Sequence, residues 1–190
     1  FRANLSANGS TDKGFTVSAH STIEVVANTL TLNTTLNGVA AEQYQLAALN
    51  TGILKKTGAG TLELKNLTVA ANNANLSIEV VAGTLLLSQA STAAISAIDL
   101  PGAAGIIVGT SGTVRLGDSS GNQISDTSSV VLNGSGSFDL AGFSETIDGL
   151  AGSGTVTTSG VSTFTIGGNN SAGLSPYTPA AAAAGVNATG

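Results

Sequence analysis

The amino-acid sequence predicts an all-β protein, folded as a single right-handed parallel β-solenoid (parallel β-helix) with about seven to eight coils. Three observations predict this fold: a short alternating motif recurs along the chain, a glycine precedes most copies, and the copies are spaced at coil length. Of the 190 residues, 42% are apolar and 9% are charged. A chain this rich in apolar residues can bury a core, whereas disorder accompanies low hydrophobicity.

The recurring motif is a threonine or serine followed by an apolar residue, any residue and, in most copies, a second apolar residue. Because side chains alternate across a β-strand, the apolar pair lies on one face. The copies occupy residues 29–32, 61–64, 84–87, 113–116, 137–140, 155–158 and 163–166. The intervals between the first six copies are uneven, and such uneven spacing is typical of a solenoid with insertions.

Glycine supplies backbone freedom at the turn before a strand. It precedes five of the copies, at Gly60, Gly83, Gly112, Gly136 and Gly154. A longer repeat is also present, because the segment IEVVA at residues 23–27 recurs at residues 78–82. The simplest interpretation is that two solenoid turns separate the two copies of this segment.

Stacking explains how such strands bury their apolar faces. Coiling turns each face inward, and stacking pairs the backbone of every coil with the coils above and below. An antiparallel sandwich or barrel is the alternative, because it also has short strands and glycine-rich turns. That fold would need tight hairpins, but few Asn-Gly pairs lie between two clear strands. We therefore expect the solenoid to span residues 1–173.

Two segments depart from the motif. Residues 39–49 (VAAEQYQLAAL) are rich in helix formers and predict a short helix, in an insertion or over the end of the stack. Residues 174–190 contain Pro176, Pro179 and an alanine run at 180–184, and predict an extended tail or linker. The alanine run could instead form a brief helix that begins near Pro179.

Composition excludes several classes of function. The net charge is −5, and the six basic residues form no stripe of the kind that binds a nucleic-acid backbone. Cysteine is absent, so no disulfide or cysteine-bound metal is expected. No apolar run approaches the roughly 18 residues of a spanning helix. We expect neither a nucleic-acid partner nor a membrane span in this chain.

Candidate catalytic residues are few. The only histidine, His20, is expected at the surface, because serine is so frequent that a nearby one would not indicate a Ser-His-Asp site. Hydrolysis of a glycosidic bond needs two converging carboxylates, for which Asp126, Asp139 and Asp148 are the best candidates. Asp139, however, is the outward residue of a predicted strand. The glycine-rich residues 167–170 lack an aspartate to bind calcium. We expect no catalytic, cofactor-binding or metal-binding residues.

Two adjacent lysines, Lys55 and Lys56, begin the strand before the second copy of the motif. Neighbouring residues of a strand point to opposite faces. We expect one lysine to point outward and the other inward, with one of them capping the turn that follows. The alternative is that the pair binds an acidic surface.

Residues 52–66 (GILKKTGAGTLELKN) and 78–88 (IEVVAGTLLLS) resemble the passenger-associated repeat of bacterial autotransporters. That repeat reads leucine-x-lysine-threonine-glycine-x-glycine-threonine-leucine-x-leucine, followed by a valine-rich strand. Its fixed positions are filled by Leu54, Lys56, Thr57, Gly58, Gly60, Thr61, Leu62 and Leu64. The resemblance covers about residues 52–170, with a weaker copy at 16–33. It implies a parallel β-helix in a secreted surface protein and, since the repeat is scaffold, no particular activity.

We therefore expect a non-catalytic, extracellular structural β-solenoid that serves as a stalk or scaffold at the bacterial cell surface. Loops at residues 36–50 and 89–105 would carry any binding function. The ends of the stack are templates for strand addition, so subunits could associate head to tail into a filament, with the tail pairing with a neighbour. Two alternatives stay open: an adhesin that binds a glycan or a host surface protein, and a polysaccharide-active enzyme.

Overall fold

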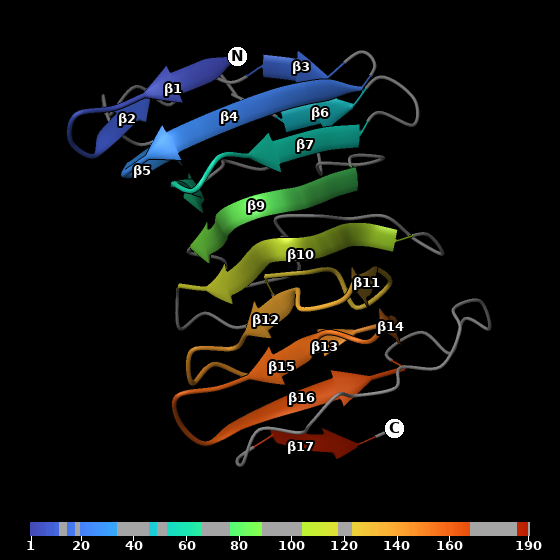
Figure 1. Ribbon diagram of the computed structural model, residues 1–190. Helices are drawn as coiled ribbons and strands as arrows, with labels where there is room; N and C mark the ends of the chain where they lie inside the picture. Colours follow the sequence, from blue (N-terminus) through green and yellow to red (C-terminus); the bar gives the residue numbers. More distant parts are fainter. Residues whose placement is uncertain are drawn as a thin grey trace.

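The computed structural model describes residues 1–11, 15–17, 20–33, 46–48, 53–65, 77–88, 104–117, 123–167 and 186–189. The regular structure within these ranges consists of seventeen β-strands without a helix. Every strand pairing within them is parallel. The strands stack one above another into a curled sheet (Figure 1). This arrangement is consistent with the predicted β-solenoid.

Twelve strands form one sheet with two rows. The first row contains, in order, β1 (Arg2–Asn4), β4 (Ser21–Ala27), β7 (Ile53–Thr57), β9 (Ser77–Ser88), β10 (Ala104–Leu116), β11 (Ser129–Leu132) and β14 (Gly149–Gly152). The second row contains β2 (Gly9–Thr11), β5 (Thr29–Asn33), β8 (Thr61–Lys65), the later halves of β9 and β10, β12 (Ser137–Asp139) and β15 (Thr155–Thr157). The long strands β9 and β10 therefore belong to both rows.

Two smaller sheets complete the described structure. One contains β13 (Glu145–Ile147), β16 (Ser162–Ile166) and β17 (Val186–Thr189), and the other contains β3 (Phe15–Val17) and β6 (Leu46–Ala48). The last copy of the motif, residues 163–166, lies in β16 and so does not extend the second row.

The second row aligns the first six copies of the motif, as the sequence predicts. The first residues of these copies lie opposite one another from strand to strand: Thr29, Thr61, Thr84, Thr113, Ser137 and Thr155. The apolar residues of the motif point inward and are buried, among them Leu30, Leu62, Leu85, Val114, Phe138 and Val156. Burying one such side chain contributes about 1.5–3 kcal/mol, so the core stabilises every step of the stack.

The two copies of the longer repeat are separated by two strand steps, because β7 lies between β4 and β9 in the first row. Two strand steps fit the interpretation that two turns separate the copies. The register, however, is shifted: Ile23 lies opposite Lys56, which lies opposite Val80 and not Ile78. One position is lost at each step, because Ile23 lies six positions before Thr29, Lys56 five before Thr61 and Val80 four before Thr84.

Two expectations about irregular segments change. The helix predicted over residues 39–49 is wrong where the structure describes it, because Leu46–Ala48 forms β6, parallel to β3. Helix propensity is a weak preference that strand pairing overrides. Within the predicted tail 174–190, Val186–Thr189 forms β17 against β16. The alanine run at 180–184 and most of the loops at 36–50 and 89–105 lie outside the described residues.

Glycines occupy the corner between the two rows because the chain passes very close to the neighbouring strand there. A Cβ atom on Gly136 would lie 2.8 Å from the carbonyl oxygen of Gly109, and one on Gly112 would overlap the carbonyl oxygen of Val80. Gly83 also has a φ of +70°, which disfavours any side chain. The sequence predicts a turn at this corner, and the structure adds close packing as the second reason for glycine.

No helix that could cross a membrane occurs among the residues described above.

Candidate functional site

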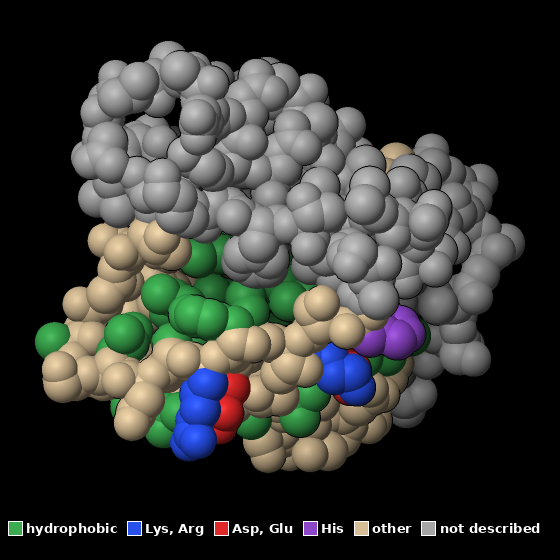
Figure 2. Space-filling model, turned by 90° about the horizontal axis from the view of Figure 1, so that it is seen from above, with side chains coloured by type: hydrophobic (Ala, Val, Ile, Leu, Met, Phe, Trp, Pro, Cys, Tyr) green, Lys and Arg blue, Asp and Glu red, His purple; other side chains and the backbone are tan. Residues whose placement is uncertain are grey.

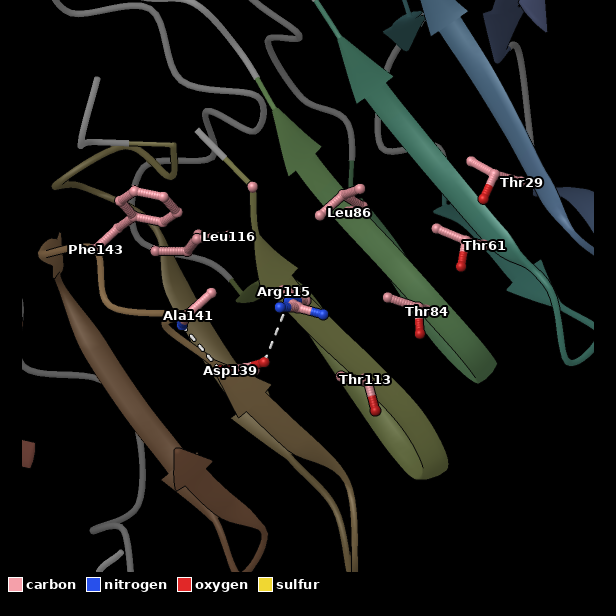
Figure 3. Close-up of a pocket in the computed structure, with 11 residues that line it drawn as sticks. Thr29, Thr61, Thr84, Leu86, Thr113, Arg115, Leu116, Asp139, Ala141 and Phe143 are labelled. Atoms are coloured by element: carbon pink, nitrogen blue, oxygen red, sulfur yellow. Dashed lines mark hydrogen bonds and ion pairs between the residues drawn. The ribbon is translucent and has the colours of Figure 1, made fainter. Parts of the chain in front are cut away.

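A groove of about 570 Å³ lies on the outer face of the second row (Figure 3). Its lining combines a column of threonines, one ion pair and a few apolar side chains. The threonines are the first residues of the second row after the corner, where Asn28 precedes Thr29 and a glycine precedes each of the others. The sequence predicts this column as a strand feature, but the hollow beside it appears only once the strands are stacked.

The threonine column consists of Thr29, Thr61, Thr84 and Thr113, whose side chains point in the same direction in Figure 3. Adjacent strands are about 4.8 Å apart, so the hydroxyl groups repeat at that interval. All four residues are half-buried. Thr113 Oγ1 lies 3.0 Å from Ser137 Oγ, which continues the column by one more strand.

An ion pair lies beside the column. Arg115 Nε is 3.3 Å from Asp139 Oδ2, and the two residues lie opposite each other in the register of β10 and β12. The backbone N–H of Ala141 donates to Asp139 Oδ1 at 2.8 Å. This second bond fixes the carboxylate, so the pair offers guanidinium donors and carboxylate lone pairs in a fixed position.

Apolar side chains close the groove at its other end. Leu86, Leu116 and Phe143 line it there (Figure 3). Phe143 is half-buried and packs against the core. The groove therefore pairs apolar surface with a small number of placed polar groups, as small-molecule and glycan sites commonly do.

The same cross-strand arrangement of opposite charges occurs twice more on the outer faces. Arg2 Nε lies 3.2 Å from Glu24 Oε2, and Lys55 Nζ lies 2.8 Å from Glu79 Oε2. Both pairs join residues directly opposite each other in the first row. Exposed pairs of this kind contribute about 0–1 kcal/mol each, so they favour the correct register more than they add stability.

Lys56 points inward, as the alternation of the lysine pair predicts. Its side chain is completely buried. The ammonium group donates to the carbonyl oxygens of Thr57, Gly58 and Ala82 at 3.0, 2.8 and 2.9 Å. Burial lowers the pKa of Lys56 to about 8. The predicted capping of the turn is thus confirmed, and the prediction that the other lysine points outward is confirmed by the pairing of Lys55 with Glu79.

Glu145 is a buried carboxylate that the sequence interpretation did not identify. It is 2% exposed and accepts hydrogen bonds from the backbone N–H groups of Gln123 at 2.7 Å and Thr146 at 3.1 Å. Burial raises the pKa of Glu145 to about 8, against the opposing effect of the backbone hydrogen bonds, and the charge of Asp126 adds to the rise. A signal for its burial was present in the sequence. Glu145 lies two residues before Ile147 in β13, so both side chains point to the same, inward face of the strand.

The three carboxylates considered for catalysis occupy different surroundings. Asp139 is held by Arg115 on the outer face, as its outward position predicts. Asp126 is exposed in a turn, and Asp148 is buried between β13 and β14. Among the described residues, no group of three or more His, Cys, Asp or Glu side chains could hold a metal ion. His20 is exposed.

Comparison with family models, curated proteins and solved structures finds no significant match to this chain. The resemblance of residues 52–66 to the passenger-associated repeat therefore stays a prediction.

Proposed function

We propose that the chain is a structural β-solenoid that serves as a stalk or scaffold at an extracellular bacterial surface. In this proposal the two rows and the β13–β16–β17 sheet are three sides of a right-handed coil, and the described strands supply seven coils. The observation that carries the proposal is the register of the second row, in which six copies of one motif stack with their apolar residues buried.

A stack of this kind suits a spacer because each coil contacts only its neighbours. Backbone pairing, the inward aliphatic side chains and the cross-strand ion pairs all act between adjacent strands. Length can then increase by adding coils without redesigning the core. Seven coils spaced about 4.8 Å apart give a rod of roughly 30 Å.

Extension at the end that carries β1 and β2 is part of the proposal. Figure 2 looks onto that end and shows hydrophobic side chains gathered on it. In the described residues β1 pairs only with β4, and β2 only with β5. Their outer backbone groups can pair with a further strand, from a longer parent chain or from a second copy stacked head to tail.

Electron microscopy and small-angle scattering across a concentration series test the proposal. We expect a rod whose length either stays constant or grows in whole-molecule steps with concentration. Association into side-by-side clusters, with no growth along one axis, would contradict end-to-end extension. Coil number and handedness are tested by an experimental structure, for which seven right-handed coils are expected.

The surface location rests on the resemblance of residues 52–66 to the autotransporter repeat and is tested separately. Fractionation of the source cells should place the protein in the surface or secreted fraction. Recovery only from the cell interior would contradict the location while leaving the rod intact.

A further inference from the structure

We propose that the groove on the outer face of the second row binds an uncharged polysaccharide chain, which lies along the stack of strands. This binding site goes beyond the structural role and does not depend on it. The inference rests on three properties of the groove: hydroxyl groups that are open to a ligand, their spacing, and the balanced charge of the lining.

The hydroxyl groups are available to a ligand. In the described part of the chain, the side chains of Thr29, Thr61 and Thr84 have no hydrogen-bond partner. A hydroxyl group can both donate and accept, which matches the mixed donor and acceptor character of a sugar hydroxyl. Because the threonines are only half-buried, their hydroxyls can exchange water for a ligand.

The spacing of the column favours a sugar polymer over other polymers. The hydroxyls repeat at the strand separation of about 4.8 Å. One pyranose ring advances a polysaccharide by a closely similar length, so successive rings can meet successive threonines. An extended peptide advances about 3.3 Å per residue, so its polar groups do not stay in step with the column.

The charge of the lining favours a neutral polymer. Among the described residues that line the groove, only Arg115 and Asp139 are charged, and they pair with each other at 3.3 Å. A uronate or phosphate polymer would meet no uncompensated cation in this lining. The pair can instead bind neighbouring hydroxyls of one sugar, because the guanidinium donates and the carboxylate accepts.

The apolar end of the groove completes the match. Leu86 and Phe143 offer apolar surface beside the polar column (Figure 3). The C–H face of a pyranose ring can pack on such surface while its hydroxyls reach the threonines and the ion pair. Ligand sites generally combine apolar contact with a few orienting polar groups in this way.

Binding is tested with the full chain and four uncharged polysaccharides: insoluble cellulose and chitin in pull-down assays, and soluble xylan and laminarin in affinity gels. The test variant is the triple change Thr61→Val, Thr84→Val and Thr113→Val, which removes hydroxyls but keeps β-branched side chains of the same size. The control is Thr57→Val, a half-buried threonine on the outer face of the first row.

We expect at least one of the four polysaccharides to bind, and the triple variant to bind it at least about tenfold more weakly, since each lost hydrogen bond costs about fivefold. The control should bind like the unchanged protein. Thermal unfolding should show that both variants are folded, and if the triple variant is not, Thr84→Val alone should weaken binding about fivefold.

Three results would overturn the proposal: none of the four polysaccharides binds, the threonine variants bind as tightly as the unchanged protein, or only a charged polymer such as alginate, or a peptide, is retained.

Discussion

Up to residue 117, the described side chains buried between the strands are almost all aliphatic, whereas residues 123–167 also bury a polar cluster. The first region buries only Lys56 and Ser88 among its described polar residues. The second region buries Gln123, Ser128, Ser129, Glu145, Asp148 and Ser162. Both regions nevertheless continue the same two rows.

The two regions also differ in their longest strands. The first region contains β9 and β10, with 12 and 13 residues, whereas β11 to β15 have three or four residues each. Short strands leave more turn backbone to be satisfied by side chains. The backbone N–H of Gly142, for example, donates to Thr158 Oγ1 at 3.1 Å. The same fold can therefore be stabilised by apolar stacking or by hydrogen bonds in polar turns. The buried carboxylate of Glu145 also makes the stability of the second region sensitive to pH.

The largest expected effect is in the aliphatic region. Leu85→Ala removes a fully buried side chain from the centre of the second row and should lower the free energy of unfolding by about 2–5 kcal/mol. Leu86→Ala, one residue later on the outer face, should cost less than about 1 kcal/mol. Chemical denaturation measures both, and equal costs would contradict the inward and outward assignment.

The next effect is in the polar region and depends on pH. The pKa of Glu145 is near 8 in the folded protein and near 4.5 when unfolded, so the folded state binds more protons between those values. Its contribution to stability is therefore present at low pH and is lost as pH rises from about 4.5 to 8, by an amount on the order of a few kcal/mol.

Glu145→Gln should remove this pH dependence, whatever its effect on stability at a single pH. Denaturation midpoints at a series of pH values measure the slope. Because the aliphatic region has no buried carboxylate among its described residues, Glu79→Gln serves as the control and should keep the slope. A slope that persists in Glu145→Gln would contradict the role of Glu145.

A smaller effect tests the glycine corner. Gly112→Ala places a Cβ atom against the carbonyl oxygen of Val80 and should cost about 1–3 kcal/mol. Gly160→Ala is the matched control, because its nearest neighbour would be the Cα atom of Gly142 at 3.6 Å, an ordinary contact. Thermal unfolding distinguishes the two, and similar melting temperatures would show that the corner can relax.

The last expected effect belongs to Lys56 and is the smallest near neutral pH, because it appears only above about pH 8. Its pKa falls from 10.5 in the unfolded chain to about 8, so stability should rise as pH increases from about 8 to 10.5. The difference between these two pKa values corresponds to a gain on the order of 3 kcal/mol. Lys56→Met should not show the rise. Glu145 lowers stability as pH rises toward 8, and Lys56 raises it above pH 8, so the unchanged protein should be least stable near pH 8. A stability that only rises or only falls with pH would contradict these roles of Glu145 and Lys56.

The second row was predictable from the sequence because its motif carries both the alternation and the glycine corner, so six copies could be aligned before any strand was placed. The opposite orientations of Lys55 and Lys56 followed from the same alternation. The strand at Leu46–Ala48 was not predictable, because its partner β3 lies far earlier in the chain. The groove was also hidden, since Arg115 and Phe143 come together with the threonines only through stacking.

The continuity of β9 and β10 across the corner has a mechanical consequence. Backbone hydrogen bonds between parallel strands lie along the stack, so a force that pulls its ends apart acts on each strand pairing in series. Counted over both rows, β9 and β10 share nine register pairs, with one register shift between Val108 and Ser111. By the same count, β11 and β12 share seven pairs with β14 and β15, and β1 and β2 share six with β4 and β5. Single-molecule pulling should therefore separate the short strands toward the two ends of the stack before it separates β9 from β10.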